Sequence, residues 1–168
     1  KRRAELLGRA AFLRKETDHA KLPNNASTTT YYTGADGLAL LSASHTLAGV
    51  AGTVYSNTSA STDLSLSGLE AAFNAIRRFK DDQGQLINLE PATLLIPPEL
   101  EWDAMEMLQA TGKAYTADNE INALRGRLKI VTWKFITDVN AWFVLVPKDD
   151  LAPLSFNRTP LEIERGGD

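Results

Sequence analysis

Three residues close together in the sequence have the side-chain types of a hydrolytic triad. Asp36, Ser42 and His45 could serve by type as the acid, nucleophile and base of acyl transfer. A triad is recognised by the spatial roles of its members, and no G-x-S-x-G elbow surrounds Ser42, which lies in a serine-rich stretch. We therefore interpret Asp36-Gly37 as a turn and His45 as a hydrogen-bonded loop residue, and we expect no catalytic residues. A small serine hydrolase using Ser42 and His45 is the alternative from another functional class.

No other group of residues has the spacing of a metal, cofactor or phosphate site. The chain has no cysteine, and His19 and His45 each lack a second histidine one helical turn away. The acidic pairs at 81–82 and 149–150 lie at expected turns, so solvated charge is the simple interpretation. Glycine-rich phosphate-binding motifs are absent from the sequence. We therefore expect neither a metal nor a cofactor.

Charge is distributed unevenly along the chain. The whole sequence has 18 basic and 21 acidic residues, a formal charge of -3. Residues 1–22 hold seven basic and three acidic residues and so carry +4, which leaves -7 for the remainder. A general nucleic-acid binder needs a broad basic face, so the composition argues against that class. No apolar run reaches the ~20 residues that span a bilayer, and the basic opening lacks the apolar stretch of a secretion signal, so we expect a soluble protein without a membrane partner.

The first third of the chain predicts one helix and then a long extended segment. Leu6, Ala10 and Leu13 are near helical spacing, which predicts an amphipathic helix over 4–16 that packs on its own domain or on a neighbouring molecule. From residue 23 to residue 63 the sequence is rich in Ser, Thr, Asn, Gly and Ala and has no helical period. Its apolar islands are at 31–32, 38–41 and 50–55. Such a segment predicts an extended loop or β-ribbon whose apolar islands are covered by another subunit.

The middle of the chain predicts two helices with a strand between them. Ser67 and Glu70 have the spacing of a capping box, which predicts that a helix starts at Ser67 and runs with one apolar stripe to about residue 80. The apolar run 93–96 predicts a strand, and the prolines that follow it suit the start of a second helix. Gly112 is expected to end that helix. The residues expected to form its buried stripe are Leu100, Ala104, Met107 and Leu108.

The last third of the chain predicts β-structure. Side chains alternate over 128–135, and 141–146 is a nearly continuous apolar run. A turn at 137–140 lies between them, which predicts that the two strands pair as a hairpin. Together with the helices, these strands give an α+β fold class.

Several short motifs then occur in an order found in one family. Residues 32–45 contain D-G-x-x-L-[FL]-S-x-x-H, a pattern that resembles a segment of Mu-like phage major head subunits. The similarity covers roughly residues 30–157. The motifs that follow in the order of that family are the helix over 69–80, the D-x-G turn at 82–84, L-L-I-P-P-E-L at 94–100, R-G-R-L at 125–128, Thr137-Asp138 and Trp142-Phe143.

The resemblance implies the Hong Kong 97-type phage capsid fold, in which a spine helix and an extended β-loop accompany an antiparallel sheet. Because the subunits of that family are longer, we expect the fold to be incomplete in this chain of 168 residues. The mapping assigns 1–22 to an N-terminal arm helix, 23–65 to the extended loop, 66–112 to a peripheral domain with the spine helix, and 113–168 to an axial-type β-rich region.

The resemblance also implies a structural function without enzymatic activity. The chain would be a major head protein, a subunit of a tailed-phage icosahedral capsid, phage or prophage encoded, that self-assembles around the viral DNA. Its implied partners are other copies in hexamers and pentamers, a scaffold or prohead protease, and packaged DNA bound only non-specifically. It would be found in the virion after assembly in the bacterial host cytoplasm. An encapsulin-like shell protein, which shares the fold, is the closest alternative.

Overall fold

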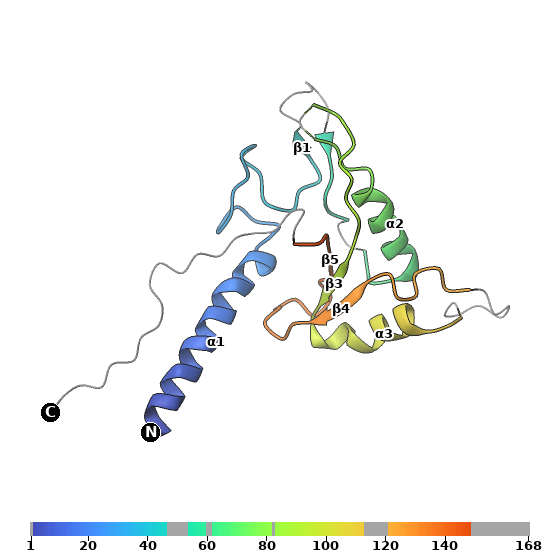
Figure 1. Ribbon diagram of the computed structural model, residues 1–168. Helices are drawn as coiled ribbons and strands as arrows, with labels where there is room; N and C mark the ends of the chain where they lie inside the picture. The colour runs from blue at the N-terminus through green and yellow to red at the C-terminus, as the bar shows by residue number, and fades with distance from the viewer. Residues whose placement is uncertain (1, 47–53, 60–61, 82, 113–120, 149–168) are drawn as a thin grey trace.

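The computed structural model has a mixed body of helices and short strands, from which one long helix projects (Figure 1). This architecture is compatible with the expected α+β class. The structure describes residues 2–46, 54–59, 62–81, 83–112 and 121–148. Its elements are, in chain order, α1 (Arg2–Asn24), β1 (His45–Thr46), β2 (Val54–Tyr55), α2 (Leu66–Ile76), β3 (Thr93–Ile96), the 3-10 helix η1 (Pro98–Leu100), α3 (Glu101–Gln109), β4 (Lys129–Thr132) and β5 (Phe143–Leu145).

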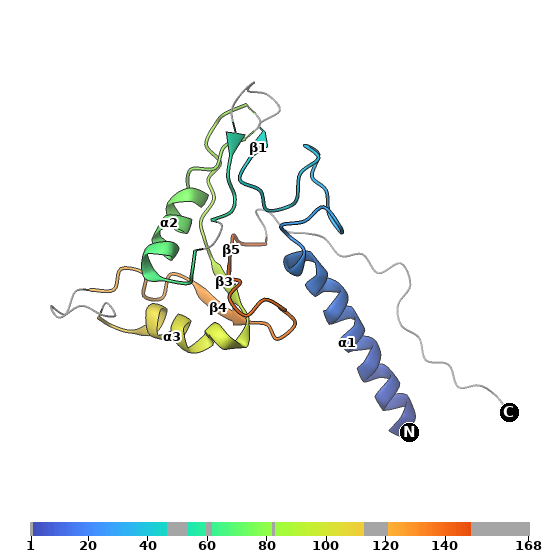
Figure 2. The same ribbon diagram turned by 180° about the vertical axis from the view of Figure 1, so that it is seen from behind.

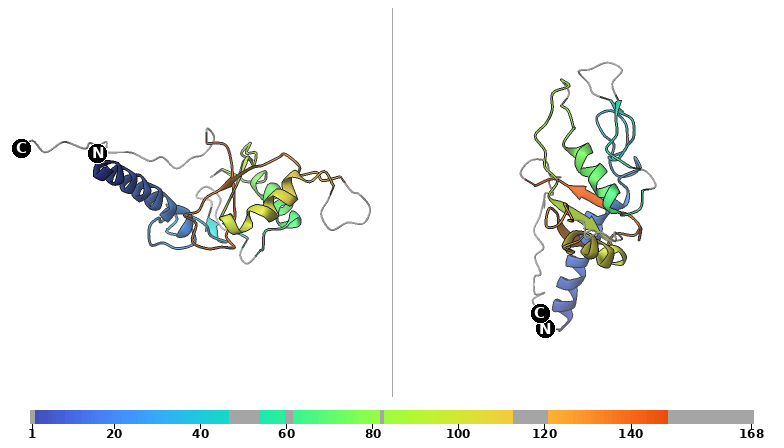
Figure 3. Two further views of the ribbon diagram at one scale, coloured as in Figure 1. Left: turned by 90° about the horizontal axis from the view of Figure 1, so that it is seen from below. Right: turned by 90° about the vertical axis from the view of Figure 1, so that its right-hand side faces the viewer.

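Helix α1 is longer than the sequence predicts, because it has 23 residues and continues well past residue 16. Asp18 supports the added turns. Its carboxylate accepts from Arg14 Nε at 3.1 Å and from Lys21 Nζ at 2.6 Å, and contacts three and four residues apart join neighbouring turns of a helix. The Lys21 hydrogen bond, helped by the nearby Arg14 charge, lowers the pKa of Asp18 below its ordinary value. In Figures 2 and 3 the helix extends away from the rest of the protein.

Helix α2 begins two residues earlier than the capping box predicts. Ser65 is the N-cap: its backbone is extended, with φ -151° and ψ 162°, and its Oγ accepts from the Gly68 amide at 3.1 Å. Ser67 lies inside the first turn, so the prediction that it caps the helix is wrong. Both Ser65 and Ser67 have side chains that could cap the helix. Ser65 is the cap in the structure, and the Leu69 amide donates to the Ser65 carbonyl as the first helical hydrogen bond.

Helix α2 also ends earlier than predicted, at Ile76. The amides of Arg78 and Phe79 donate to carbonyls three residues back, which tightens the last turn. The backbone then reverses in a narrow turn: the Ile87 amide donates to the Phe79 carbonyl at 2.9 Å, and Gly84 has a φ of +82° that suits glycine. Phe79 therefore belongs to this turn and is not a residue of the helix.

The corrected cap can be tested by mutation. We expect Ser65→Ala to lower the free energy of unfolding by about 1 kcal/mol, because the Gly68 amide loses its side-chain acceptor. Ser67→Ala is the matched control and should have a much smaller effect, since the Ser67 hydroxyl lies near the Ser65 hydroxyl and does not accept from a helix amide. Urea unfolding of both variants measures the difference. Equal losses, or a larger loss for Ser67→Ala, would contradict the assignment of the cap.

Strand β3 is the centre of a three-stranded sheet with the order β4-β3-β5. It pairs with β4 in parallel and with β5 in antiparallel orientation. The predicted hairpin between 128–135 and 141–146 is therefore wrong. The apolar strand β3 buries Leu94 and Ile96 completely, and neighbours on both sides satisfy the backbone groups of its two edges. A parallel pair needs a long crossover, which η1, α3 and residues 121–128 supply.

The core lies where α2 and α3 pack on this sheet. The predicted apolar stripes are largely confirmed, because Leu69, Phe73 and Ile76 of α2 are buried, as are Ala104 and Leu108 of α3. Leu100 and Met107, the other two residues of the second stripe, are partly buried against the same cluster. Buried core residues from β3 and from the segment that leads to β4 are Leu94, Ile96, Leu124 and Leu128.

Helix α3 ends at Gln109, and Ala110 is already extended, so Gly112 does not form the predicted stop. A side chain from later in the chain completes the end of the helix. The side-chain Nδ2 of Asn122 donates to the carbonyls of Met107 at 2.6 Å and Ala110 at 3.2 Å, and its Oδ1 accepts from the Leu124 amide at 3.1 Å. A tertiary contact, rather than a local glycine, therefore satisfies these carbonyls.

Candidate functional site

The structure places the three residues of the possible triad at the base of a short ribbon made by β1 and β2. His45 is buried, with Nδ1 2.6 Å from Asp36 Oδ2 and Nε2 3.3 Å from the Leu40 carbonyl oxygen. Its ring stacks on Tyr55, the residue paired with it across the ribbon, with 5.3 Å between ring centroids. Both imidazole nitrogens therefore face acceptors other than the Ser42 hydroxyl.

Ser42 has other partners. Its Oγ accepts from the Ser44 amide at 3.2 Å and lies 3.3 Å from Ser44 Oγ, while its backbone amide donates to Asn57 Oδ1 at 2.9 Å. Asn57 also donates through Nδ2 to the Leu40 carbonyl at 2.8 Å. The geometry thus brings acid and base together without the nucleophile. Asn57, which sequence reasoning missed, joins the two sides of the ribbon base.

Asp36 forms the turn expected at Asp36-Gly37. Its Oδ1 accepts from the Leu38 amide at 3.1 Å, and Gly37 has a φ of +77°, which strains other residues. The hydrogen bond from His45, together with that from Leu38, lowers the pKa of Asp36 below its ordinary value of 3.8. Asp36 and His45 therefore tie the loop to the ribbon, which is a positioning role that needs no chemistry.

This contact predicts a pH dependence. A lowered pKa in the folded state means that the ionised Asp36 stabilises the fold above pH 3.8, and that this stabilisation is lost as the pH falls through the folded-state pKa. Asp36→Asn should therefore unfold at a lower urea concentration at neutral pH. The difference between variant and native protein should shrink as the pH falls below 3.8.

His45→Gln is the matched variant for that experiment, because it keeps the carboxylate and removes its main partner. In this variant the pKa of Asp36 should return toward its ordinary value, so stability should fall less on acidification than in the native protein. An Asp36→Asn variant whose deficit stays the same from neutral pH to pH 3 would contradict the ion pair's role.

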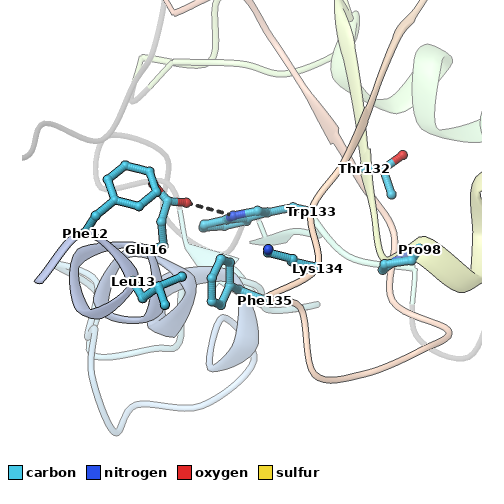
Figure 4. A pocket seen from close by; sticks show the side chains of 8 residues that line it. All are labelled: Phe12, Leu13, Glu16, Pro98, Thr132, Trp133, Lys134 and Phe135. Carbon is cyan, nitrogen blue, oxygen red and sulfur yellow. Dashed lines mark hydrogen bonds between the residues drawn. The ribbon is translucent and has the colours of Figure 1, made fainter. Parts of the chain in front are cut away.

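Helix α1 is fixed to the body by polar contacts of its C-terminal half. Glu16 Oε2 accepts from Trp133 Nε1 at 3.1 Å, as Figure 4 shows. Asn24 Nδ2 donates to the Phe135 carbonyl at 2.9 Å, and Asn24 Oδ1 accepts from the Thr137 amide at 3.0 Å. One side of the helix thus docks on the turn that follows β4, which sets the direction in which the helix projects.

An open cavity of about 320 Å³ lies beside this contact, between α1 and the turn after β4 (Figure 4). Its walls are mainly aromatic and aliphatic: Phe12 and Leu13 come from α1, and Trp133 and Phe135 come from the turn. Glu16, the acidic group in its lining, already accepts from the Trp133 indole. The cavity therefore has the character of a contact surface rather than of a site for chemistry.

Large apolar side chains are exposed on the projecting helix and on the ribbon. The sequence-predicted stripe of α1 is not covered, because Leu6 is 58% and Leu13 39% exposed. In the extended segment Tyr31 is 59% and Tyr32 46% exposed, whereas residues 38–41 are half-buried. The third apolar island, 50–55, lies partly outside the described residues. Its described strand residues Val54 and Tyr55, together with Leu7 and Phe12 of α1, are also exposed.

The described residues hold no group of three or more His, Asp or Glu side chains that could bind a metal ion. His19 lies on α1 and His45 in the ribbon. The acidic pair at 149–150 and residue 82 lie outside the described residues. Among the described helices, none is both long and apolar enough to cross a membrane.

Comparison with known proteins gives one family. A family model described as phage capsid protein matches residues 1–168, the whole chain. No curated protein and no solved structure matches the sequence. The whole-length match agrees with a protein whose exposed apolar side chains suit contact with other subunits. The chain therefore belongs to the phage capsid protein family, whose members are structural proteins of the virion that assemble into an oligomeric shell.

Proposed function

We propose that the chain is a major head subunit of a tailed-phage icosahedral capsid, of the Mu-like type and with a Hong Kong 97-type fold. It acts by self-assembly around the viral DNA in the bacterial host cytoplasm, through hexamers and pentamers, with a scaffold or prohead protease as a helper. The motif order over 32–45 and 94–100 supports the Mu-like type, and the whole-chain family match supports the capsid role.

We further propose that the arm is residues 1–22 and the extended loop residues 23–65. The projecting direction of α1 supports the first assignment, and the β1-β2 ribbon with its flanking loops supports the second. Residues 66–112 remain proposed as a peripheral domain whose spine helix contains α2, and 113–168 as an axial-type region. The described strands of these last two parts share one sheet, so the two parts would form a continuous unit.

The observation that carries the proposed function is the exposure of apolar side chains on parts that project from a body with its own core. Leu6 and Leu7 on α1 are each 58% exposed, and Tyr31 in the loop is 59% exposed, although Leu69 and Leu94 are fully buried. Covering such side chains in a neighbour stabilises the contact by ~25 cal/mol per Å² of buried apolar surface. Symmetry repeats each contact, so weak interfaces can close a stable shell.

The net charge suits a shell around DNA. The chain carries -3 in total, so a shell built from it would not hold the genome tightly by a general basic surface. The basic residues are concentrated in 1–22, where their contacts can set the register between subunits. DNA would then be enclosed and bound only non-specifically.

Electron microscopy and sedimentation velocity of the purified chain test this function. We expect rings, sheets or shells in the native protein, and we expect the double variant Tyr31→Ser with Tyr32→Ser to assemble only at markedly higher protein concentration. Both tyrosines are exposed, so their loss removes contact area between subunits while the core is unchanged.

The neighbouring exposed residues provide the control for this experiment. Thr29→Ser with Thr30→Ser changes the same loop without removing an aromatic ring and should assemble as the native protein does. Circular dichroism and urea unfolding confirm that each variant is folded. If the tyrosine variant assembles at the native concentration, the loop is not an intersubunit contact; if no form of the protein assembles, the capsid function itself is contradicted.

A further inference from the structure

The face of α1 that docks on its own body continues along the helix beyond the body. Glu16 and Ala20 lie on the docked face, since Glu16 accepts from Trp133 and Ala20 is 1% exposed. Leu6, Arg9 and Leu13 precede them at spacings of three and four residues, which places all five on one side of the helix. Leu6 and Arg9 are nevertheless exposed. The body therefore covers this side of α1 in its C-terminal half and leaves it uncovered in its N-terminal half.

The outer face of η1 and α3 has the opposite charge and also exposes a large apolar group. Glu99, Trp102, Asp103 and Glu106 follow one another at i, i+3, i+4 and i+7, so they share one face, and all four are exposed. Trp102 is 73% exposed. Residues 98–109 contain four acidic and no basic residues. An indole surrounded by carboxylates is a surface that a basic and apolar partner would fit.

The uncovered half of α1 has that chemistry. Residues 2–15 contain five basic and one acidic residue, a net charge of +4 against -4 on 98–109. Leucine side chains can pack on the indole of Trp102, and the guanidinium of Arg9 can lie over its face. The two segments are also matched in length, because at 1.5 Å per residue each is on the order of 20 Å long.

Within one chain the uncovered end of α1 does not lie on α3. Figures 1 and 2 show that α1 runs from the body with its free end directed away from α3. We propose that the N-terminal half of α1, through Leu6 and Arg9, packs on the Trp102 face of α3 in a second copy of the chain. This inference rests on the proposed self-assembly and specifies one contact between two subunits. Since the two surfaces differ, the contact is head-to-tail and generates rings when its rotation closes.

A charge-swap experiment on the full chain tests this pairing. Arg3→Glu with Arg9→Glu reverses two charges of the arm, Asp103→Lys with Glu106→Lys reverses two charges of the α3 face, and a third variant carries all four changes. We expect each double change alone to raise the protein concentration needed for assembly about tenfold or more. The combined variant should assemble at a lower concentration than either double change alone, because the exchanged residues again face opposite charges. Trp102→Ser should also weaken assembly, and it leaves the acidic charges in place. Sedimentation velocity and electron microscopy provide the measurements.

Asp63→Lys with Glu70→Lys is the matched control, since it makes the same charge change at exposed positions near the start of α2 and should leave assembly unchanged. If the α3 reversal assembles like the native chain, or if the combined variant is no better than either single reversal, the pairing is wrong and the capsid function stands. If the arm reversal leaves assembly intact and reduces only the DNA that shells retain, the arm contacts nucleic acid and the pairing is also wrong.

A second measurement decides the pairing even if the native chain forms no shells, which would count against the proposed function. The chain has no cysteine, so single cysteines can be introduced at chosen positions. A Leu6→Cys variant mixed with a differently tagged Glu106→Cys variant should form covalent heterodimers with a short bismaleimide. Leu6→Cys mixed with Glu70→Cys should form far fewer. Equal yields in the two mixtures would overturn the proposed contact.

Discussion

A Leu94→Ala variant should unfold with a free energy about 2–5 kcal/mol lower than that of the native chain. Leu94 is fully buried in β3, where its backbone pairs with Ile130 of β4 and Val144 of β5. Truncation removes apolar contacts and leaves a cavity at the centre of the sheet, which neighbours on both sides prevent from collapsing. Urea unfolding followed by circular dichroism measures the loss.

The control for Leu94 is another leucine without a buried environment. Leu86 is 68% exposed in the turn after α2, and Leu86→Ala should change the unfolding free energy by less than about 0.5 kcal/mol. A small effect of Leu94→Ala, similar to that of Leu86→Ala, would show that β3 is not the centre of the core. Assembly of a shell needs many folded subunits, and the Leu94 variant has a smaller folded fraction. It should therefore also give fewer particles.

Local periodicity explains which parts of the fold could be predicted. The stripe of α2 and the strand 93–96 depend on residues close together in the sequence, and both are confirmed by the burial of Leu69, Phe73 and Leu94. The same reasoning identifies Ala104 and Leu108 as the buried side of α3. The period of the apolar residues indicates which side of a helix or strand is apolar, and the core of the protein buries that side.

Tertiary pairing explains the wrong predictions. The sequence between β4 and β5 has the form of a turn, but β3 lies between the two strands, and no residue of that turn encodes this order. The predicted cap of α2 is wrong because Ser65 and Ser67 both have suitable side chains. The choice between them depends on the extended backbone of Ser65, which the sequence alone does not specify.

For the possible triad, residue types alone predict only part of the hydrogen bonding. Asp36 forms the expected turn and His45 is hydrogen-bonded as expected, and the two residues bond to each other. The other contacts could not be predicted, because the Leu40 carbonyl binds His45 from the loop before β1, and Asn57 binds Ser42 and the same carbonyl from the other side of the ribbon base. A catalytic constellation depends on which atoms the imidazole nitrogens face, and here they face a carboxylate and a backbone carbonyl.

The exposure of the two loop tyrosines has a physical reason that can be read from the sequence. Tyr31 and Tyr32 lie in a segment without enough periodic apolar sequence to build its own core, so the sequence indicates that another molecule covers them. The exposure of α1 could not be predicted, because a stripe such as Leu6 and Leu13 has the same pattern whether it packs within one chain or between chains. The two alternatives differ in the direction of the helix, and in the structure α1 projects away from the body.

Asn122 should prove the most sensitive polar residue of the core. It is 5% exposed and makes three hydrogen bonds, to the carbonyls of Met107 and Ala110 and from the Leu124 amide. Asn122→Ala removes the partner of the buried Leu124 amide and of the two partly buried carbonyls, so we expect a loss of about 1–3 kcal/mol in the free energy of unfolding. The exposed Asn88 provides the control, and Asn88→Ala should lie within about 0.5 kcal/mol of the native chain.

Asn122→Asp separates the donor function from the shape of the side chain. At neutral pH the introduced carboxylate can still accept from the Leu124 amide, but it cannot donate to the Met107 and Ala110 carbonyls and is repelled by them. Burial beside two carbonyl oxygens should raise its pKa in the folded state, so the variant should be most stable at acidic pH and lose stability as the pH rises through that pKa. Urea unfolding of this variant across pH would show the trend. If its stability relative to the native chain does not change with pH, the donor hydrogen bonds of Asn122 do not hold the end of α3.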